Sequence, residues 1–374
     1  MPVPRLLAFH LPQFHPIPEN DEWWGAGFTE WTNVVKARSL FRGHYQPHLP
    51  TDLGFYDLRL PEAREAQATL AREYGIHGFC YYHYWFSGRR LLQRPVDEIV
   101  ATGKPEFPFC LCWANENWTR VWDGLERQVL MKQAYSVEAD RRHIADLAKY
   151  FRDSRYIRIH GKPVFLVYRA SSLPDPKRTL EVWREEAQRL GLGELYLCRV
   201  ESMGGDNGKP LQAGFDAAVE FAPDWTVRPP EIGRTVMDRL LRKLGRAPSV
   251  YLDHSIRSYE ALIRNMLAKP EPDYLRFRCV TPSWDNSSRR TSGSNIFIGS
   301  DPTLYQEWLE RVIAEFRPPS EEENLVFINA WNEWGEGNHL EPCARWGRGY
   351  LDATRAALSR RKTTELVSTD LVVR

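Results

Sequence analysis

The feature that most constrains the fold is a series of short apolar segments that alternates with amphipathic helical patterns along the chain. Each segment is too short for a helix and is rich in Val, Phe, Tyr or Cys, which is typical of a buried strand. The candidate strands are Leu6–His10, Gly78–Tyr82, Phe109–Trp113, Val164–Tyr168, Leu195–Val200, Ala217–Phe221, Phe277–Thr281 and Val326–Ala330. The stretches between them predict helices at Pro61–Tyr74, Ala139–Asp153, Leu180–Leu190, Tyr259–Leu267 and Leu304–Phe316.

Eight strand–helix units predict an α/β fold, a (β/α)8 TIM barrel that forms a single domain over residues 1–374. The competing fold is a doubly wound sheet, but no G-x-G-x-x-G follows the first candidate strand, and no phosphate-binding G-x-x-x-x-G-K-[ST] occurs. Two long inserts, 11–57 and 222–258, interrupt the pattern, and long loops in a compact domain are usually functional. The second insert is basic, and a solvated helical face is the preferred interpretation of it.

Composition excludes several classes of protein. A net charge of +1 gives no reason to expect nucleic acid or an anionic membrane as a partner. No window approaches 18 apolar residues, so we expect no membrane span, and without a recognisable secretory signal we expect a cytoplasmic protein. The spacing of the six cysteines does not match a metal site, so we expect no metal. We expect all six thiols to be reduced, and we expect no cofactor. The high content of aromatic residues, 14 Trp, 16 Tyr and 17 Phe, suits a site that stacks on sugar rings.

The string VFINAWNEWGEGNHLEP, residues 326–342, is the strongest candidate for chemistry because an apolar run ends in Glu333 and Glu336 among tryptophans. Cleavage of a glycosidic bond needs one carboxyl group as acid and a second group that assists attack at the anomeric carbon. If the chain turns here, the two Cβ atoms come within about 5–6 Å. Like charges at that distance raise one pKa, which separates an acid from a base. The alternative is a surface turn with two solvated glutamates.

Polar and aromatic residues also follow the other candidate strands, at the end of the barrel where active sites lie. His10 and His83 could instead be structural histidines, Glu116 could cap a turn, and Glu220 and Asp285 could form ion pairs with Arg169 or Arg199. The candidate substrate-binding residues are His10, Gln13, Glu30, Trp31, Tyr82, His83, Tyr84, Trp113, Asn115, Glu116, Trp118, Tyr168, Glu220, Trp284, Asp285, Asn332 and Trp334.

Several long strings resemble the WbsX-type proteins of bacterial polysaccharide gene clusters, which are similar to glycoside hydrolase family 99. These strings are LPQFHPIPENDEWWGAGFTEWTNV (11–34), YGIHGFCYYHYWFSGRR (74–90), PFCLCWANENWTRVWDG (108–124), GKPVFLVYR (161–169), TPSWDNSSRR (281–290) and NAWNEWGEGNHLEP (329–342). Family 99 comprises retaining endo-α-mannosidases with a (β/α)8 fold, and its motif resembles E-W-x-E-G.

The resemblance implies roles for the two glutamates. Glu333 would remove the proton from the sugar 2-OH, which attacks the anomeric carbon and gives a 1,2-anhydro sugar. Glu336 would protonate the leaving group and then activate water. The chain has Gly335 where the mannosidases often have His, and His10 where an aromatic residue is usual, so one sugar contact is expected to differ.

These observations predict a retaining glycoside hydrolase, or a transglycosylase, that acts on α-linked sugars of a bacterial surface polysaccharide or its precursor. The expected partner is therefore an oligosaccharide or polysaccharide, and the oligomeric state is open. A glycosyltransferase is the first alternative, although the sequence has no D-x-D motif and no Gly-rich phosphate loop. A non-catalytic carbohydrate-binding protein is the second, although it would need no acid.

Overall fold

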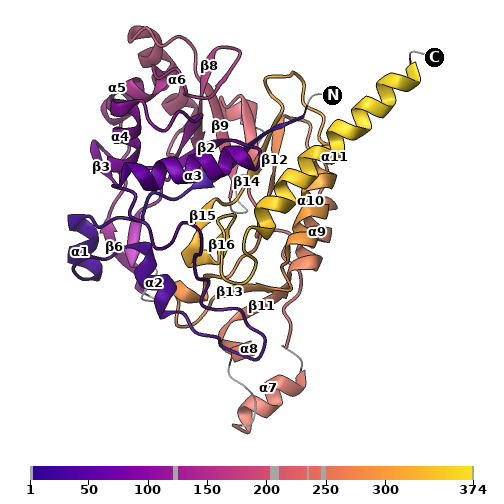
Figure 1. Cartoon of the computed structure of the whole chain (residues 1–374). Helices are drawn as coiled ribbons and strands as arrows, with labels where there is room; N and C mark the ends of the chain where they lie inside the picture. Colours follow the sequence, from indigo (N-terminus) through magenta and orange to yellow (C-terminus); the bar gives the residue numbers. More distant parts are fainter. Residues whose placement is uncertain (1–2, 121–124, 203–209, 234–235, 246–249, 373–374) are drawn as a thin grey trace.

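Eight parallel strands close into a barrel at the centre of the molecule (Figure 1). The computed structural model describes residues 3–120, 125–202, 210–233, 236–245 and 250–372. The neighbour order is β1-β14-β12-β10-β9-β8-β4-β2, and pairing of β1 with β2 closes the barrel. The barrel strands are β1 (Arg5–His10), β2 (Ile76–Phe86), β4 (Phe109–Trp113), β8 (Lys162–Val167), β9 (Tyr196–Glu201), β10 (Ala217–Glu220), β12 (Arg276–Val280) and β14 (Leu325–Ile328). The predicted TIM barrel is therefore confirmed.

Aromatic rings fill the inside of the barrel. Phe9 packs against Tyr82, Phe221 and Phe327, with ring centroids 5.6, 6.1 and 5.6 Å apart. Strands covered on both faces need apolar residues at successive positions, which is why the barrel strands read as short continuous apolar runs. The filled interior leaves the carboxyl ends of the strands as the place for a cavity.

The helices between the barrel strands match the predicted stretches to within a few residues. Proline occupies the first turn of α3, α6 and α10, where its missing N–H would have no helical partner. The sequence analysis did not identify α4 or α11. The helices around the barrel are α3 (Pro61–Glu73), α4 (Arg94–Thr102), α5 (Val137–Phe151), α6 (Pro176–Arg189), α9 (Tyr259–Leu267), α10 (Pro302–Glu315) and α11 (Gly349–Val372).

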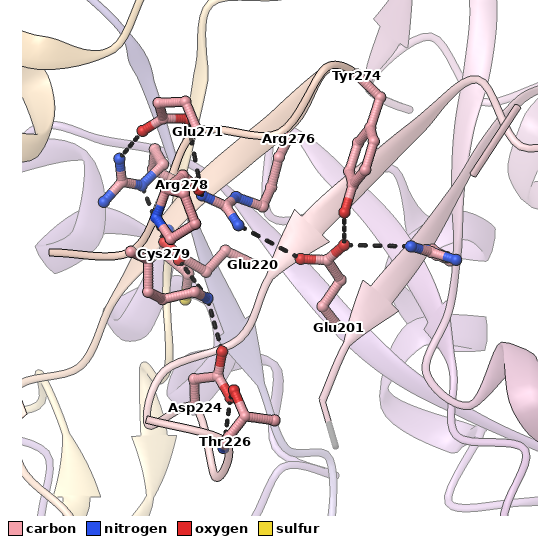
Figure 2. Close-up of polar contacts among 12 residues, drawn as sticks. Glu201, Glu220, Asp224, Thr226, Glu271, Tyr274, Arg276, Arg278 and Cys279 are labelled. Carbon is pink, nitrogen blue, oxygen red and sulfur yellow. Dashed lines mark hydrogen bonds and ion pairs between the residues drawn. The ribbon is translucent and has the colours of Figure 1, made fainter. Parts of the chain in front are cut away.

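One strand–helix unit differs from the expected pattern. Between β9 and β10, the described residues contain no α-helix, only the 3-10 turn η3 (Pro210–Ala213). On β9, β10 and β12, buried charged side chains form a network (Figure 2). In it, Arg278 pairs with Glu220, and Arg276 lies 3.9 Å from Glu201.

The two inserts and most of the shorter elements extend the loops that follow the barrel strands, whereas β7 precedes β8. β11 pairs with β13, β15 with β16, β5 with β6, β2 with β3, and β7 with β8. Their bounds are α1 (Pro18–Trp24), α2 (Glu30–Lys36), β3 (Arg89–Leu91), β5 (Trp118–Arg120), β6 (Leu125–Met131), β7 (Arg158–Ile159), η2 (Ala170–Ser172), α7 (Val236–Lys243), α8 (Val250–Asp253), β11 (Ser255–Ser258), η4 (Asn286–Arg289), β13 (Asn295–Ile298), β15 (Asn332–Glu333), η5 (Trp334–Glu336) and β16 (Asn338–His339).

The six cysteines are buried and free. Within the described ranges, no helix is both long and apolar enough to cross a bilayer. The same part of the chain contains no group of three or more His, Cys, Asp or Glu side chains arranged to hold a metal ion.

Candidate active site

A cavity of about 780 Å³ opens at the carboxyl ends of the barrel strands. Its walls combine eight aromatic side chains with polar and charged ones, as in sites that hold sugar rings. Gln13 presents a buried side-chain Nε2 that has no hydrogen-bond partner among the described residues, so it can donate to a ligand. The predicted residues that line the cavity are Gln13, Tyr82, Tyr84, Glu116, Trp118, Tyr168, Trp284, Glu333 and Glu336.

The loop after β14 brings the two glutamates to this cavity. Glu333 ends β15, and Glu336 ends the single turn η5 that follows it. Gly337 has a φ of +56°, and this left-handed conformation lets the chain reverse into β16, which pairs with β15. A Cβ atom on Gly337 would also lie 3.1 Å from Cβ of Asp285. The tight turn therefore fixes both carboxyl groups on one side of the loop.

One guanidinium joins three carboxylates at the cavity. Arg289 Nε lies 2.8 Å from Glu30, Nη2 lies 2.9 Å from Glu333 and Nη1 lies 2.8 Å from Glu336. The Glu30 side chain is completely buried and packs on Gly335, where a Cβ atom would lie 1.7 Å from Oε1 of Glu30. The third carboxylate thus requires Gly at position 335, the x of the E-W-x-E-G motif.

The pKa values of Glu333 and Glu336 are raised because both side chains are buried and the nearby positive charge does not compensate for burial. Burial raises the pKa of Glu333 to about 8; Arg289 opposes the shift, and Glu336 and Glu30 add to it. Burial also raises the pKa of Glu336. Burial acts to lower the pKa of Arg289, but the surrounding carboxylates outweigh it and hold that pKa well above its usual value. Near neutral pH the Glu333–Glu336 pair therefore holds a proton that one member can donate.

Another buried carboxyl group, that of Glu341, holds the loop with Glu333 and Glu336 in place. Glu341 accepts hydrogen bonds from Trp334 Nε1 (2.6 Å), Gln67 Nε2 (2.7 Å) and Tyr56 OH (2.9 Å). Burial raises its pKa to about 7. Asn332 bonds both backbone polar groups of Leu11, at 2.7 and 3.0 Å, and so ties this loop to the one after β1. Trp334 and Asn332 therefore position the loop and lie outside the cavity lining.

The two candidate histidines lie outside the cavity lining. His10 Nε2 lies 3.2 Å from Oε1 of Gln67, and His83 Nε2 lies 3.1 Å from Nε2 of His143. Burial lowers the pKa of both His10 and His83 to about 3, so both rings are neutral. These contacts match the structural alternative raised for them in the sequence analysis.

Three other candidate residues pack behind the cavity wall. Asn115 bonds the backbone N–H and C=O of Arg169, each at 2.8 Å, and so positions the Arg169 side chain that pairs with Glu116. Trp113 is buried and donates to the backbone oxygen of Trp85, and Trp31 is buried in the aromatic core. Their contacts are those of supporting residues.

Glu220 and Asp285 are both buried in ion pairs away from the cavity lining. Glu220 pairs with Lys269 (2.8 Å) and Arg278 (3.0 Å), and Asp285 lies 2.6 Å from Nε2 of His44 (Figure 2 shows the first group). Burial acts to raise the pKa of each carboxyl, but these partners outweigh it and hold both values below the usual range. Both were candidate substrate-binding residues in the sequence analysis, with ion pairs to Arg169 or Arg199 as the alternative; the partners are instead Lys269, Arg278 and His44.

The sequence analysis missed Arg289 as a site residue, although it lies in the string TPSWDNSSRR that carries the resemblance. An arginine pair shortly after a barrel strand was the available signal. The 222–258 insert also reaches the site, since Trp225 and Arg228 line the cavity. The other lining residues that were not predicted as site residues are Phe86, Ala114, Asn117, Thr119, Arg169, Phe221, Asn286, Arg290 and Asn295.

The family model described as "Glycosyltransferase WbsX" matches residues 6–354. Two curated relatives from strains of Xanthomonas campestris pv. campestris, each described as "Uncharacterized protein WxcX", are 46% identical over 357 residues. The match covers 95% of this chain and 50% of each relative, so the chain spans about half the length of the curated relatives it matches.

Solved structures with the same fold include a "Glycoside hydrolase-like protein", with a TM-score of 0.59, 13% identity and 96% of both chains covered. The endo-alpha-mannosidase of glycoside hydrolase family 99 from Bacteroides thetaiotaomicron has a TM-score of 0.56 and 13% identity, over 96% of this chain and 98% of that one. At this identity the likeness shows the barrel fold.

Proposed function

The chain belongs to the WbsX glycosyltransferase family, and we propose that it is a retaining glycoside hydrolase, or a transglycosylase with the same chemistry. The proposed substrate is an α-linked glycan, a bacterial surface polysaccharide or its precursor. The observation that carries the proposal is that Glu333 and Glu336 share one guanidinium at an aromatic cavity. Their raised pKa values provide a proton for the leaving oxygen near neutral pH.

The proposed reaction has two steps, with the roles that the resemblance implies. Glu333, ionised, accepts the proton of the sugar 2-OH, whose oxygen bonds to the anomeric carbon. The bond to the leaving oxygen breaks while Glu336 donates its proton to that oxygen. Water or an acceptor hydroxyl then opens the 1,2-anhydro sugar, giving a proton to Glu336, and Glu333 returns its proton to O2. Two displacements at one carbon retain its configuration.

Arg289 supports this reaction as a positioning residue. Its guanidinium bonds both glutamates and Glu30, so it holds the two reacting carboxyl groups in one geometry. Tyr82, Tyr84 and Trp118 offer faces on which sugar rings can rest. Gln13 Nε2 offers a donor to a sugar hydroxyl.

The test is incubation of the purified protein with synthetic α-linked mannosides and 6-deoxyhexosides, with products followed by NMR from the first minutes. A first product of retained anomeric configuration, absent with Glu333→Gln, is the expected result. A first product of inverted configuration would contradict the two-step reaction.

A glycosyltransferase is the second candidate, favoured by the description of the family model. Such an enzyme needs to bind a nucleotide sugar. Calorimetry with UDP- and GDP-sugars tests this: binding, followed by a new linkage when an acceptor is added, would replace the hydrolase proposal. A sugar-binding protein without catalysis would instead bind oligosaccharides and turn over none of them.

A further inference from the structure

Helix α7 presents an apolar face to solvent. Within the described residues, five of the twelve exposed large apolar side chains lie between residues 232 and 244. Of these, Val236 is 82% exposed, Met237 61%, Leu240 52% and Leu244 62%. Positions 236, 240 and 244 follow the i, i+4, i+8 spacing of a single helical stripe. A contiguous apolar stripe of this kind on a soluble surface usually marks an interaction site.

The helix projects away from the barrel, at the opposite end of the molecule from α11 (Figure 1). The segment just before α7, residues 231–233, is bonded to the rest of the 222–258 insert. Ile232 N–H donates to the backbone oxygen of Ile256 (2.8 Å), and Glu231 pairs with Arg257 (2.7 Å). Gly233 packs closely on Tyr251, since a Cβ atom there would lie 2.5 Å from that ring. The apolar stripe of α7 therefore begins close to a segment that is anchored to the rest of the insert.

The charge of residues 234–246 indicates which kind of partner the apolar stripe of α7 contacts. Residues 234–246 contain five Arg or Lys and one Asp, whereas the whole chain has a net charge of only +1. A short helix with an apolar stripe and a high content of basic residues is the pattern of segments that lie in the interface of an anionic bilayer. A second copy of this chain would bring the same positive charge, which disfavours a symmetric dimer through this face.

We propose that α7 docks the protein on an anionic lipid bilayer, with its apolar stripe inserted among the lipids. The same insert supplies Trp225 and Arg228 to the catalytic cavity, so docking would bring that cavity near the membrane surface. If the proposed function holds, the substrate class is then a glycan carried on a lipid. The docking itself does not depend on the chemistry of Glu333 and Glu336.

The test is co-sedimentation of the full chain with vesicles of phosphatidylcholine alone, and with vesicles in which phosphatidylglycerol replaces half of it. We expect binding to the anionic vesicles, weakened by added salt. The double variant Leu240→Glu, Leu244→Glu should lower the partition coefficient by about tenfold or more, since charges replace inserted apolar groups. Lys243→Glu should lower it by a smaller factor.

Leu60→Glu is the matched control, because Leu60 is 54% exposed at the start of α3, outside the insert. It should bind as the wild type does, and circular dichroism should show all variants folded. Absence of wild-type binding to anionic vesicles would overturn the proposal, as would equal loss in Leu60→Glu or none in the double variant. A wild-type dimer that the double variant breaks, without vesicle binding, would assign the stripe to a second copy.

Discussion

Two groups of buried carboxylates follow barrel strands, and they differ in charge balance. In the cluster that we propose to be catalytic, three carboxylates surround one cation, whereas in the structural cluster two carboxylates face two cations. The catalytic cluster comprises Glu30, Glu333, Glu336 and Arg289. The structural cluster comprises Glu220, Asp224, Lys269 and Arg278 (Figure 2).

The difference in balance decides what each cluster can do. In the catalytic cluster burial prevails, and the pKa of Glu333 rises to about 8. In the structural cluster the cations prevail over burial, and the pKa values of Glu220 and Asp224 stay below the usual range. The Glu333–Glu336 pair keeps a proton near neutral pH and opens to a cavity, so one member can act as an acid and the other as a base. A permanently ionised buried carboxylate instead pairs with buried cations of the fold.

The largest expected effect is loss of activity in Glu336→Gln. Gln keeps the shape of the side chain but can neither donate nor accept the proton, so turnover should fall about 10³-fold or more. The check is the initial rate on the substrate identified by NMR, with the melting temperature near that of the wild type. Glu116→Gln, a carboxylate on the same cavity, should lose much less. Wild-type turnover in Glu336→Gln would remove the catalytic cluster from the mechanism.

In the structural cluster, Glu220→Gln should reduce stability and leave activity per folded molecule near the wild-type value. Lys269 and Arg278 lose their shared buried partner, at a cost of about 3 kcal/mol or more. Urea denaturation measures this cost. The matched control is Glu271→Gln, because Glu271 also pairs with Arg278 but is 66% exposed and should contribute less than about 1 kcal/mol. Equal costs for the two variants would contradict the account.

Gly335→Ala should reduce activity per folded molecule about 100-fold and should also lower the free energy of unfolding by about 1–3 kcal/mol, because the new Cβ overpacks a buried site. The new Cβ would lie 1.7 Å from Oε1 of Glu30 and 2.7 Å from Nε of Arg289, so both must move away from the glutamate pair. Gly349→Ala is the control, since the nearest atom to its Cβ would be a ring carbon of Pro302, at 3.0 Å. Steady-state kinetics compares the two. An active Gly335→Ala variant would show that Glu30 and Arg289 do not position the pair.

The smallest expected effect is on the pH profile. If Glu333 is the base, its ionised form increases as pH rises toward 8, and kcat/KM should rise with it. The charge of Glu30 adds to the raised pKa, so Glu30→Gln should move this limb of the profile to lower pH. A profile that instead falls through a midpoint near pH 8 would give Glu333 the role of acid.

The fold was predictable because its signal is local. Each barrel strand is a short apolar run, and several helices begin at a proline, so alternation along the chain was enough. The positions of Glu333, Glu336 and five of the aromatic residues of the cavity lining were also predictable, since side chains after parallel strands meet at one end of a barrel, but Phe86, Phe221 and Trp225 were not predicted.

The partners of the charged residues were not predictable from strand ends alone. Glu220 and Glu333 both follow a barrel strand, but Lys269 and Arg278 reach one and Arg289 reaches the other from distant segments. His83 looked equally suited to a site, yet it packs on His143 behind the wall. The basic character of the 222–258 insert was noted from the sequence, but the exposed apolar stripe of α7 was not predicted. These outcomes depend on long-range packing.

The most direct test of the comparison is ¹³C NMR of the side-chain carboxyl groups in Glu-labelled protein, titrated with pH. Glu333→Gln and Glu220→Gln identify the two signals by their disappearance. The account predicts that Glu333 titrates with a midpoint near pH 8, while Glu220 stays ionised as the pH falls through 4.5, the usual value for Glu. A Glu333 signal that titrates at or below 4.5 would contradict the difference between the two clusters.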